Sequence, residues 1–175
     1  MKKFIPTYHA QSIYEVPLEF FKQNKIKNIL IDLDNTLSSY KEHVATEKTK
    51  AFINTIIKEG FNVIIVSNNR GKRVATYAAS IGVEFRADMR KPLIFKFRRL
   101  LSEKKFEKHA TILVGDQLLT DVLVANRIGI RSMFVDKLVE EDQWTTKFNR
   151  LLERPIKKSL IKRKKLRNWR DSYGT

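Results

Sequence analysis

The sequence has no cysteine and no long apolar run. The absence of cysteine excludes disulfide bonds, thiolate zinc sites and cysteine nucleophiles. No apolar stretch approaches the roughly 18–20 residues needed to span a bilayer. The amino terminus, Met-Lys-Lys-Phe-Ile-Pro, has no long apolar region behind its two lysines, as a secretory signal would. We therefore expect a cytoplasmic protein.

Acidic residues are also scarce. The chain has 19 Asp and Glu against 35 Lys and Arg, a formal net charge of +16, while its 42% of hydrophobic residues is ordinary for a globular domain. Residues 150–175 hold 10 basic and 2 acidic side chains, so less than a fifth of the chain carries half of the excess. This distribution implies a polyanionic partner, either a nucleic acid or an anionic membrane face.

Short apolar runs alternate with segments of helical periodicity from residue 28 to residue 135, without internal repeats. Strands are predicted at 29–31, 61–66, 83–85, 110–114 and 132–135, and helices at 46–60, 70–81, 92–103 and 122–128. Right-handed crossovers between such strands build a mostly parallel sheet with helices on both faces. The predicted fold class is therefore α/β, a Rossmann-like three-layer sandwich.

The two ends of the chain do not follow this alternation. Residues 1–27 are predicted to form an arm that packs on the body, with a short helix after Pro17, and residues 28–149 to form the domain. In the basic tail, residues 150–175, we expect Pro155 to break a helix. The weak amphipathicity of the tail is typical of a solvated extension. The alternative is a tail, carrying Trp169, that recruits the protein to an anionic surface and contributes little to the chemistry.

Polar side chains follow four of the predicted strands, at the end of the sheet where ligands bind in α/β proteins. They are Asp32 and Asp34, Ser67 and Asn68, Lys91, and Asp116 and Asp121. Each group has an ordinary explanation, since Asp-x-Asp-Asn suits a turn and Lys91 is one of many basic residues. Together they favour phosphoryl transfer, which needs a cation site, a phosphate clamp, a nucleophile and a proton donor. Carboxylates without a Cys or His cluster favour Mg²⁺.

Four sequence motifs resemble, in order, those of the haloacid dehalogenase-like (HAD) phosphatases. They are Asp-Leu-Asp-Asn-Thr-Leu at 32–37, Ser-Asn-Asn at 67–69, Lys-Pro at 91–92 and Gly-Asp-Gln-x-x-Thr-Asp at 115–121. The motifs look most like those of subfamily IIIA and its YqeG-like group, and they cover residues 28–135. The resemblance implies a HAD-like fold.

The resemblance also implies a role for each motif residue. Asp32 is the implied nucleophile, which forms an aspartyl-phosphate, and Asp34 the implied acid and base. The implied Mg²⁺ ligands are Asp32, the Asp34 backbone carbonyl, Asp116 and, directly or through water, Asp121. The implied phosphate-binding residues are Ser67, Asn68 and Lys91, with Lys91 also neutralising charge beside the nucleophile.

Motif spacing limits the size of any insertion. About 30 residues separate Thr36 from Ser67 and about 23 separate Ser67 from Lys91, too few for a folded cap domain, so we expect an open pocket. Relatives of the YqeG-like group include phosphatidylglycerophosphate phosphatases. The resemblance thus implies a phosphomonoester on a lipid head group, which an open site and a basic tail suit. A soluble phosphatase for a small phosphometabolite and a basic RNA- or ribosome-associated binding protein remain as alternatives.

Overall fold

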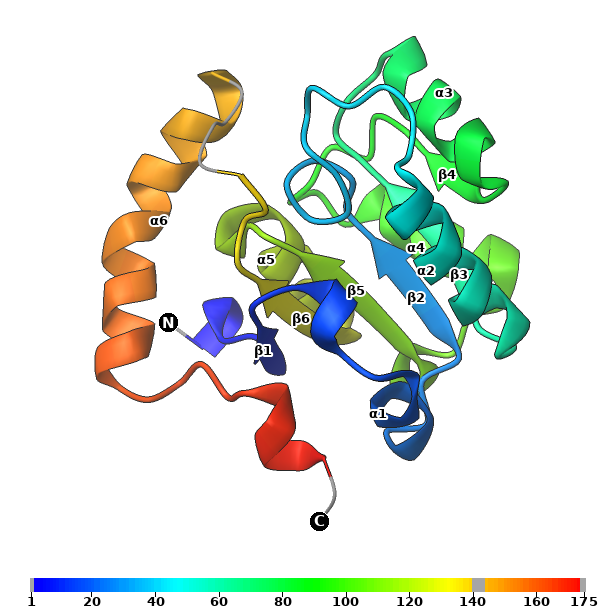
Figure 1. The fold of residues 1–175 in the computed structure, drawn as a ribbon. Helices are drawn as coiled ribbons and strands as arrows, with labels where there is room; N and C mark the ends of the chain where they lie inside the picture. The colour runs from blue at the N-terminus through cyan, green and yellow to red at the C-terminus, as the bar shows by residue number, and fades with distance from the viewer. Residues whose placement is uncertain (1, 140–143, 174–175) are drawn as a thin grey trace.

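The computed structural model describes residues 2–139 and 144–173. Within these residues the strands form one parallel sheet in the order β1-β6-β5-β2-β3-β4 (Figure 1). The strands are β1 (Tyr8–Ala10), β2 (Asn28–Ile31), β3 (Asn62–Val66), β4 (Glu84–Arg86), β5 (Thr111–Gly115) and β6 (Arg131–Val135). The helices are α1 (Leu18–Gln23), α2 (Glu47–Lys58), α3 (Lys72–Ile81), α4 (Phe95–Lys104), α5 (Leu123–Ile128) and α6 (Trp144–Lys162).

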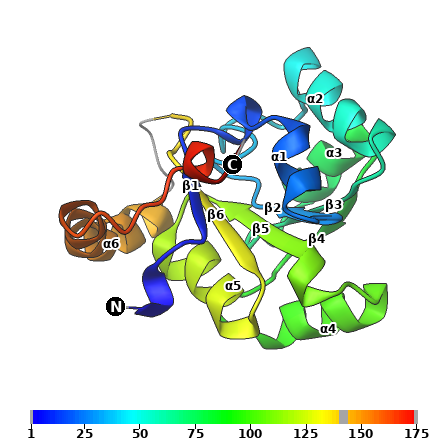
Figure 2. The ribbon, with the colours of Figure 1, turned by 90° about the horizontal axis from the view of Figure 1, so that it is seen from below.

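This arrangement confirms the predicted α/β sandwich. Helices α1, α2 and α3 cover one face of the sheet, and α4 and α5 cover the other (Figure 2). Alternate residues of each central strand point to opposite layers: Ile29 and Ile31 of β2 join the core under α1–α3, whereas Leu30 joins the core under α4 and α5. The near-continuous apolar strands of the sequence are therefore buried on both faces.

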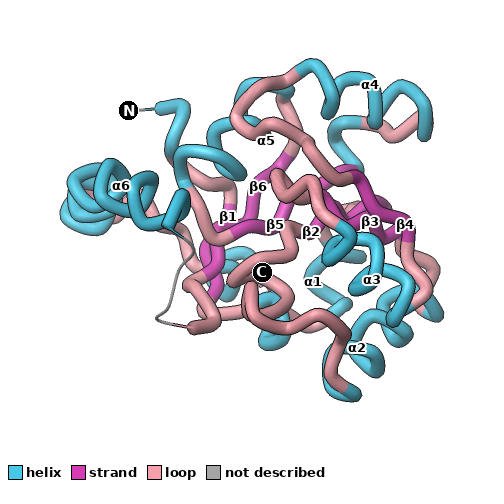
Figure 3. Tube along the Cα trace, turned by 90° about the horizontal axis from the view of Figure 1, so that it is seen from above, coloured by secondary structure: helices cyan, strands magenta, loops and turns pink. Residues whose placement is uncertain are grey.

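The order of the strands places a crevice at the carboxyl end of β2. From β2 the chain continues outward through β3 to β4, and then returns to form β5 on the other side of β2. Loops leaving β2 and β5 consequently diverge to opposite faces, which creates the topological switch point where α/β proteins bind ligands. Figure 3 looks down on the sheet from the side where these strands end.

Local signals in the sequence set several helix ends. The Thr46 hydroxyl accepts a hydrogen bond from Thr49 N at 3.2 Å and caps α2, as predicted. Gly82 ends α3 with φ +65°, a left-handed conformation that costs glycine little. Helix α4 begins at Phe95, three residues after the predicted start at Pro92.

The basic carboxyl-terminal segment differs from the predicted tail. Pro155 lies inside α6, so the prediction that it breaks the helix is wrong. Buried Glu153 and Leu160 hold α6 to the domain on either side of the proline, which offsets the backbone hydrogen bond that proline cannot donate. Trp169 is buried in the main core, although residues 161–165 are exposed. The segment is therefore anchored at both ends.

The amino-terminal arm packs on the body, as predicted, and also adds a strand that the sequence did not reveal. Strand β1 pairs with β6 at the edge of the sheet. Its outer side meets the carboxyl-terminal segment, where His9 N donates to Arg167 O at 2.7 Å. The first and last described parts of the chain thus lie side by side.

Among the described residues no helix combines the length and apolar character that crossing a membrane requires.

Replacement of Trp169 tests whether the carboxyl-terminal segment is part of the domain. The indole packs edge-on against Phe20, with ring centroids 5.7 Å apart, and its Nε1 donates to Glu15 at 3.3 Å. We expect Trp169→Ala to lower the free energy of unfolding by about 3 kcal/mol, as for other large aromatic truncations. Urea unfolding measures this change, with Ile161→Ala, an exposed position in the same segment, as the control. Equal stability of the two variants would mean that the segment is not docked.

Candidate active site

Asp32 is the first residue beyond β2, and its backbone still forms a hydrogen bond with the neighbouring strand. Its backbone N donates to Val114 O of the neighbouring β5 at 2.9 Å, and its carboxylate is buried. The chain then turns sharply: Asn35 has φ +63°, and its N donates to Ser38 O at 2.7 Å. The Asp-x-Asp-Asn stretch is therefore a turn, and it also places Asp32 at the switch point.

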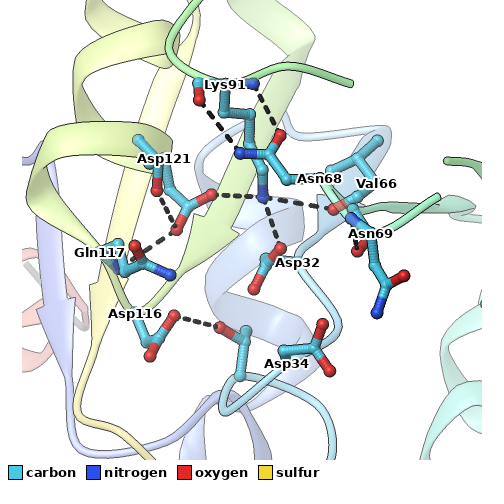
Figure 4. Close-up of polar contacts among 12 residues, drawn as sticks. Asp32, Asp34, Val66, Asn68, Asn69, Lys91, Asp116, Gln117 and Asp121 are labelled. Carbon is cyan, nitrogen blue, oxygen red and sulfur yellow. Dashed lines mark hydrogen bonds and ion pairs between the residues drawn. The ribbon is translucent and has the colours of Figure 1, made fainter. Parts of the chain in front are cut away.

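The side chain of Lys91 occupies the centre of the site (Figure 4). Its Nζ pairs with the Asp32 carboxylate, donates to Asp121 Oδ1 at 2.7 Å and lies 3.4 Å from Val66 O. All three ionic groups are buried. Lys91 thus links the ends of β2, β3 and β5, although it follows β4 in the sequence.

Asn68 fixes the backbone that carries Lys91. Its Oδ1 accepts from Lys91 N at 2.6 Å, and its Nδ2 donates to Lys91 O at 3.0 Å. Met89 N adds a hydrogen bond to Ser67 O at 3.0 Å. The predicted phosphate-binding Asn68 therefore uses its amide to position Lys91. Ser67, buried beside it, accepts from Asn69 N at 3.0 Å, and its hydroxyl can still donate.

Asp116 directly follows β5, and Asp121 reaches the site from the helical turn after it. The π-helical turn Leu118–Val122 directs Asp121 back toward the strand, where its Oδ2 accepts from Gln117 N at 3.1 Å. Asp121 packs directly over Gly115: a Cβ at position 115 would lie 2.2 Å from Asp121 Cγ. The glycine before Asp116 is therefore needed to admit the second carboxylate.

The carboxylates of Asp32, Asp116 and Asp121 form a buried group that could hold a metal ion. One oxygen from each lies within 4.8 Å of the others. Oxygen donors alone, without thiolate or imidazole, are the ligands that Mg²⁺ prefers. The donor set of this chain therefore fits the predicted cofactor.

The electrostatics of the site favour an added cation. Burial raises the pKa of Asp32 well above its usual range, although the nearby Lys91 opposes this shift. Burial also raises the pKa of Asp116 to about 6, against the effect of Arg150. Burial would lower the pKa of Lys91, but Asp121 and Asp32 raise it above its usual range. A bound divalent cation would stabilise the ionised carboxylates.

Asp34 faces away from this group (Figure 4). Its carboxylate pairs with Arg73 Nη1, from the first turn of α3. Arg73 also donates to the backbone carbonyls of Glu42 and Ser39, at 3.1 and 2.8 Å, and so fixes the loop that follows Asp34. The sequence did not point to Arg73, which is one of many basic residues in the chain.

Helix α6 supplies two further residues that the sequence analysis assigned to a tail outside the site. Arg150 donates to Asp116 O at 2.6 Å and also pairs with the Asp116 carboxylate. Buried Glu153 accepts from Leu119 N at 2.7 Å, at the start of the turn that carries Asp121. Burial raises the pKa of Glu153 to about 7. No local motif marks these residues, because their partners lie 34 positions earlier.

Comparisons with known proteins identify related phosphatases. A sequence model of the family described as mitochondrial PGP phosphatase matches residues 1–140. The "Probable phosphatase YqeG" of Bacillus subtilis (strain 168) is 35% identical over 170 residues, which cover 97% of this chain and 98% of that protein. The family model thus includes Asp32, Lys91 and Asp121, whereas the match to the Bacillus protein also extends over α6.

Solved structures share the fold at low sequence identity. The cobalt-bound deoxy-D-mannose-octulosonate 8-phosphate phosphatase of Haemophilus influenzae has a TM-score of 0.52 and 15% identity, over 65% of this chain and 70% of that chain. The 3-deoxy-D-manno-octulosonate 8-phosphate phosphatase of Yersinia pestis has a TM-score of 0.51 and 14% identity, over 73% and 83%. An uncharacterized protein of Listeria monocytogenes serotype 4b has a TM-score of 0.54 and 19% identity, over 67% and 85%.

These structural likenesses concern the fold, whereas the family model and the Bacillus relative extend along most of the sequence. The chain therefore belongs to the mitochondrial PGP phosphatase family and is a phosphatase of the HAD type.

Proposed function

We propose that the protein is a Mg²⁺-dependent phosphomonoester hydrolase that acts through an aspartyl-phosphate on Asp32. The observation that carries this proposal is the position of the Asp32 carboxylate, at the switch point between Lys91 and two further carboxylates. A nucleophile, a cation and a metal-binding group thus meet at one place, as phosphoryl transfer requires.

In the proposed first step an Asp32 oxygen attacks phosphorus, and the bond from phosphorus to the leaving oxygen breaks. Asp34 gives its proton to that oxygen. In the second step water attacks the aspartyl-phosphate, Asp34 takes a proton from the water, and inorganic phosphate leaves. Because Arg73 holds the Asp34 carboxylate in the structure, this side chain must turn toward the substrate to act.

Three other groups support these steps. Lys91 Nζ offsets negative charge between the nucleophile and the incoming phosphate, and the Ser67 hydroxyl donates to a phosphoryl oxygen. Asn68 acts through Lys91, whose backbone it holds. Mg²⁺, when bound by Asp32, the Asp34 carbonyl, Asp116 and Asp121, would stabilise charge on the transferring phosphoryl group.

The proposed substrate is phosphatidylglycerophosphate. The family description and the open site support this choice: residues 32–61, all described in the structure, contain α2 and no cap domain. Within the described residues no cap domain covers the strand ends, so a phosphate on a lipid can approach them directly. A phosphate-release screen with Mg²⁺, comparing this lipid with soluble phosphomonoesters, tests the proposal. Preference for a soluble metabolite would assign the enzyme to small-molecule metabolism instead.

Replacement of the nucleophile tests the covalent route. We expect Asp32→Asn to reduce the Mg²⁺-dependent turnover of a soluble aryl phosphate by about a thousandfold or more, since loss of a catalytic nucleophile has effects of this size. The fold should survive, because the amide is isosteric with the carboxyl group. Turnover is measured by phosphate release and folding by thermal denaturation. A folded variant that keeps wild-type turnover would remove Asp32 from this role.

The role of Asp34 predicts a dependence on the leaving group. An activated aryl phosphate needs little protonation of its leaving oxygen, whereas an alkyl phosphate needs much. We therefore expect Asp34→Asn to slow alkyl phosphate hydrolysis far more than aryl phosphate hydrolysis, measured as kcat/KM for both. Equal slowing of the two substrates would instead indicate a structural or metal-binding role.

Glu153 predicts that α6 supports the metal site. Glu153→Ala removes the acceptor for Leu119 N and frees the turn that carries Asp121. We expect the affinity for Mg²⁺ to fall about 10–100-fold, as for other groups that orient metal ligands. Glu153→Gln keeps an acceptor oxygen and should bind Mg²⁺ nearly as well as the wild type.

Calorimetric titration with Mg²⁺ measures both variants, with Leu152→Ala as a control for the exposed face of α6. If Glu153→Ala binds Mg²⁺ like the wild type, the contact of Glu153 with Leu119 does not support the metal site.

A further inference from the structure

The segment that runs from Lys91 into the start of α4 exposes two large apolar side chains. Leu93 and Phe95 follow Lys91 by two and four residues, and they are 49% and 74% exposed. The segment follows the carboxyl end of β4. Both residues therefore lie on the side of the sheet where the strands end, as the active site does. Large apolar side chains exposed so close together in the sequence are candidates for a contact surface.

A cluster of basic side chains lies in the same part of the chain and on the loop after β3. Arg70, Arg90 and Lys96 share one carboxylate, that of Asp88, with N–O distances of 2.9, 3.2 and 2.8 Å. A single carboxylate neutralises only one of three cations, so the cluster keeps a net positive charge. We call Arg70, Arg90, Leu93, Phe95 and Lys96 the rim surface.

We propose that the rim surface docks the enzyme on an anionic lipid bilayer. Leu93 and Phe95 enter the interfacial layer, and the three cations meet lipid phosphates. This inference rests on the proposed function, in which the substrate phosphate stands on a lipid. Because Lys91 lies within a few residues of Leu93 and Phe95, docking brings the bilayer surface next to the active site.

Distance favours the rim surface over the basic carboxyl-terminal segment. Arg150 of α6 reaches Asp116, and Lys162, twelve positions further on, lies about 18 Å away along the helix. Helix α6 extends from the end of the molecule that holds the active site toward the opposite end (Figure 1). The polar layer of a leaflet is only about 5–8 Å thick. A bilayer bound by residues 162–167 would therefore lie too far from Asp32.

Vesicle flotation of the full chain tests the proposal. The vesicles contain phosphatidylcholine alone or mixed equally with phosphatidylserine, an anionic lipid that is neither substrate nor product. We expect wild-type protein to float with the anionic vesicles and to lose binding as salt rises. The double variant Leu93→Ser/Phe95→Ser should bind at least about tenfold more weakly, because two apolar side chains no longer leave water.

Two variants make the comparison specific. Leu152→Ser/Ile161→Ser on α6 removes apolar side chains of similar exposure, 48% and 57%, and should bind as the wild type does. Arg70→Gln/Arg90→Gln should lose the salt-sensitive part of the binding. All variants should keep their thermal stability, and the two double variants that replace apolar residues should hydrolyse a soluble aryl phosphate at the wild-type rate.

Wild-type binding by the Leu93→Ser/Phe95→Ser variant, or an equal loss in the α6 variant, would overturn the docking surface. So would a wild-type protein that binds RNA but no vesicles. Hydrolysis of the soluble phosphate by such a protein would leave the proposed phosphatase activity intact. Conversely, vesicle binding through the rim surface without any Mg²⁺-dependent hydrolysis would support the docking surface and contradict the proposed function.

Discussion

The ammonium group of Lys91 lies between the carboxylates of Asp32 and Asp121, and all three groups are buried. Burying one charge is costly, and burying two carboxylates side by side without a cation is costlier still. The lysine makes their proximity tolerable, so three segments distant in sequence can converge on one point. A metal ion placed among the remaining oxygens completes the same charge balance.

Several local features follow from keeping this lysine in place. Asn68 holds the lysine backbone with both atoms of its amide, and Gly115 leaves room for Asp121. Both residues shape the site without any contact with a substrate. Their identity is set by geometry around the charged centre, and this explains why two plain residues, an amide and a glycine, lie inside the motifs that identify the family.

The central part of the fold was readable from the sequence because its signals are local. Strands β2, β3 and β5 are short apolar runs, and each ends in a recognisable polar motif. Strand β1 was missed because three residues carry no periodicity, and it exists only through pairing with β6. The sequence also did not indicate Arg73, Arg150 and Glu153. Their roles depend on partners that lie 31 to 39 positions away along the chain. The prediction that Pro155 ends a helix was wrong because the tertiary contacts of α6 outweigh the tendency of proline to break helices.

The pairing of the two ends of the chain has a consequence for the order in which the protein is made. Strand β1 is synthesised first, but its partner Met133 and its neighbour Arg167 come more than 120 residues later. The growing polypeptide can assemble β2 to β5 while the first residues wait without a partner, since domains fold as their segments emerge. The edge of the sheet can close only after β6 and Arg167 have been made, so a chain that stalls before them would leave an open strand edge ready to aggregate.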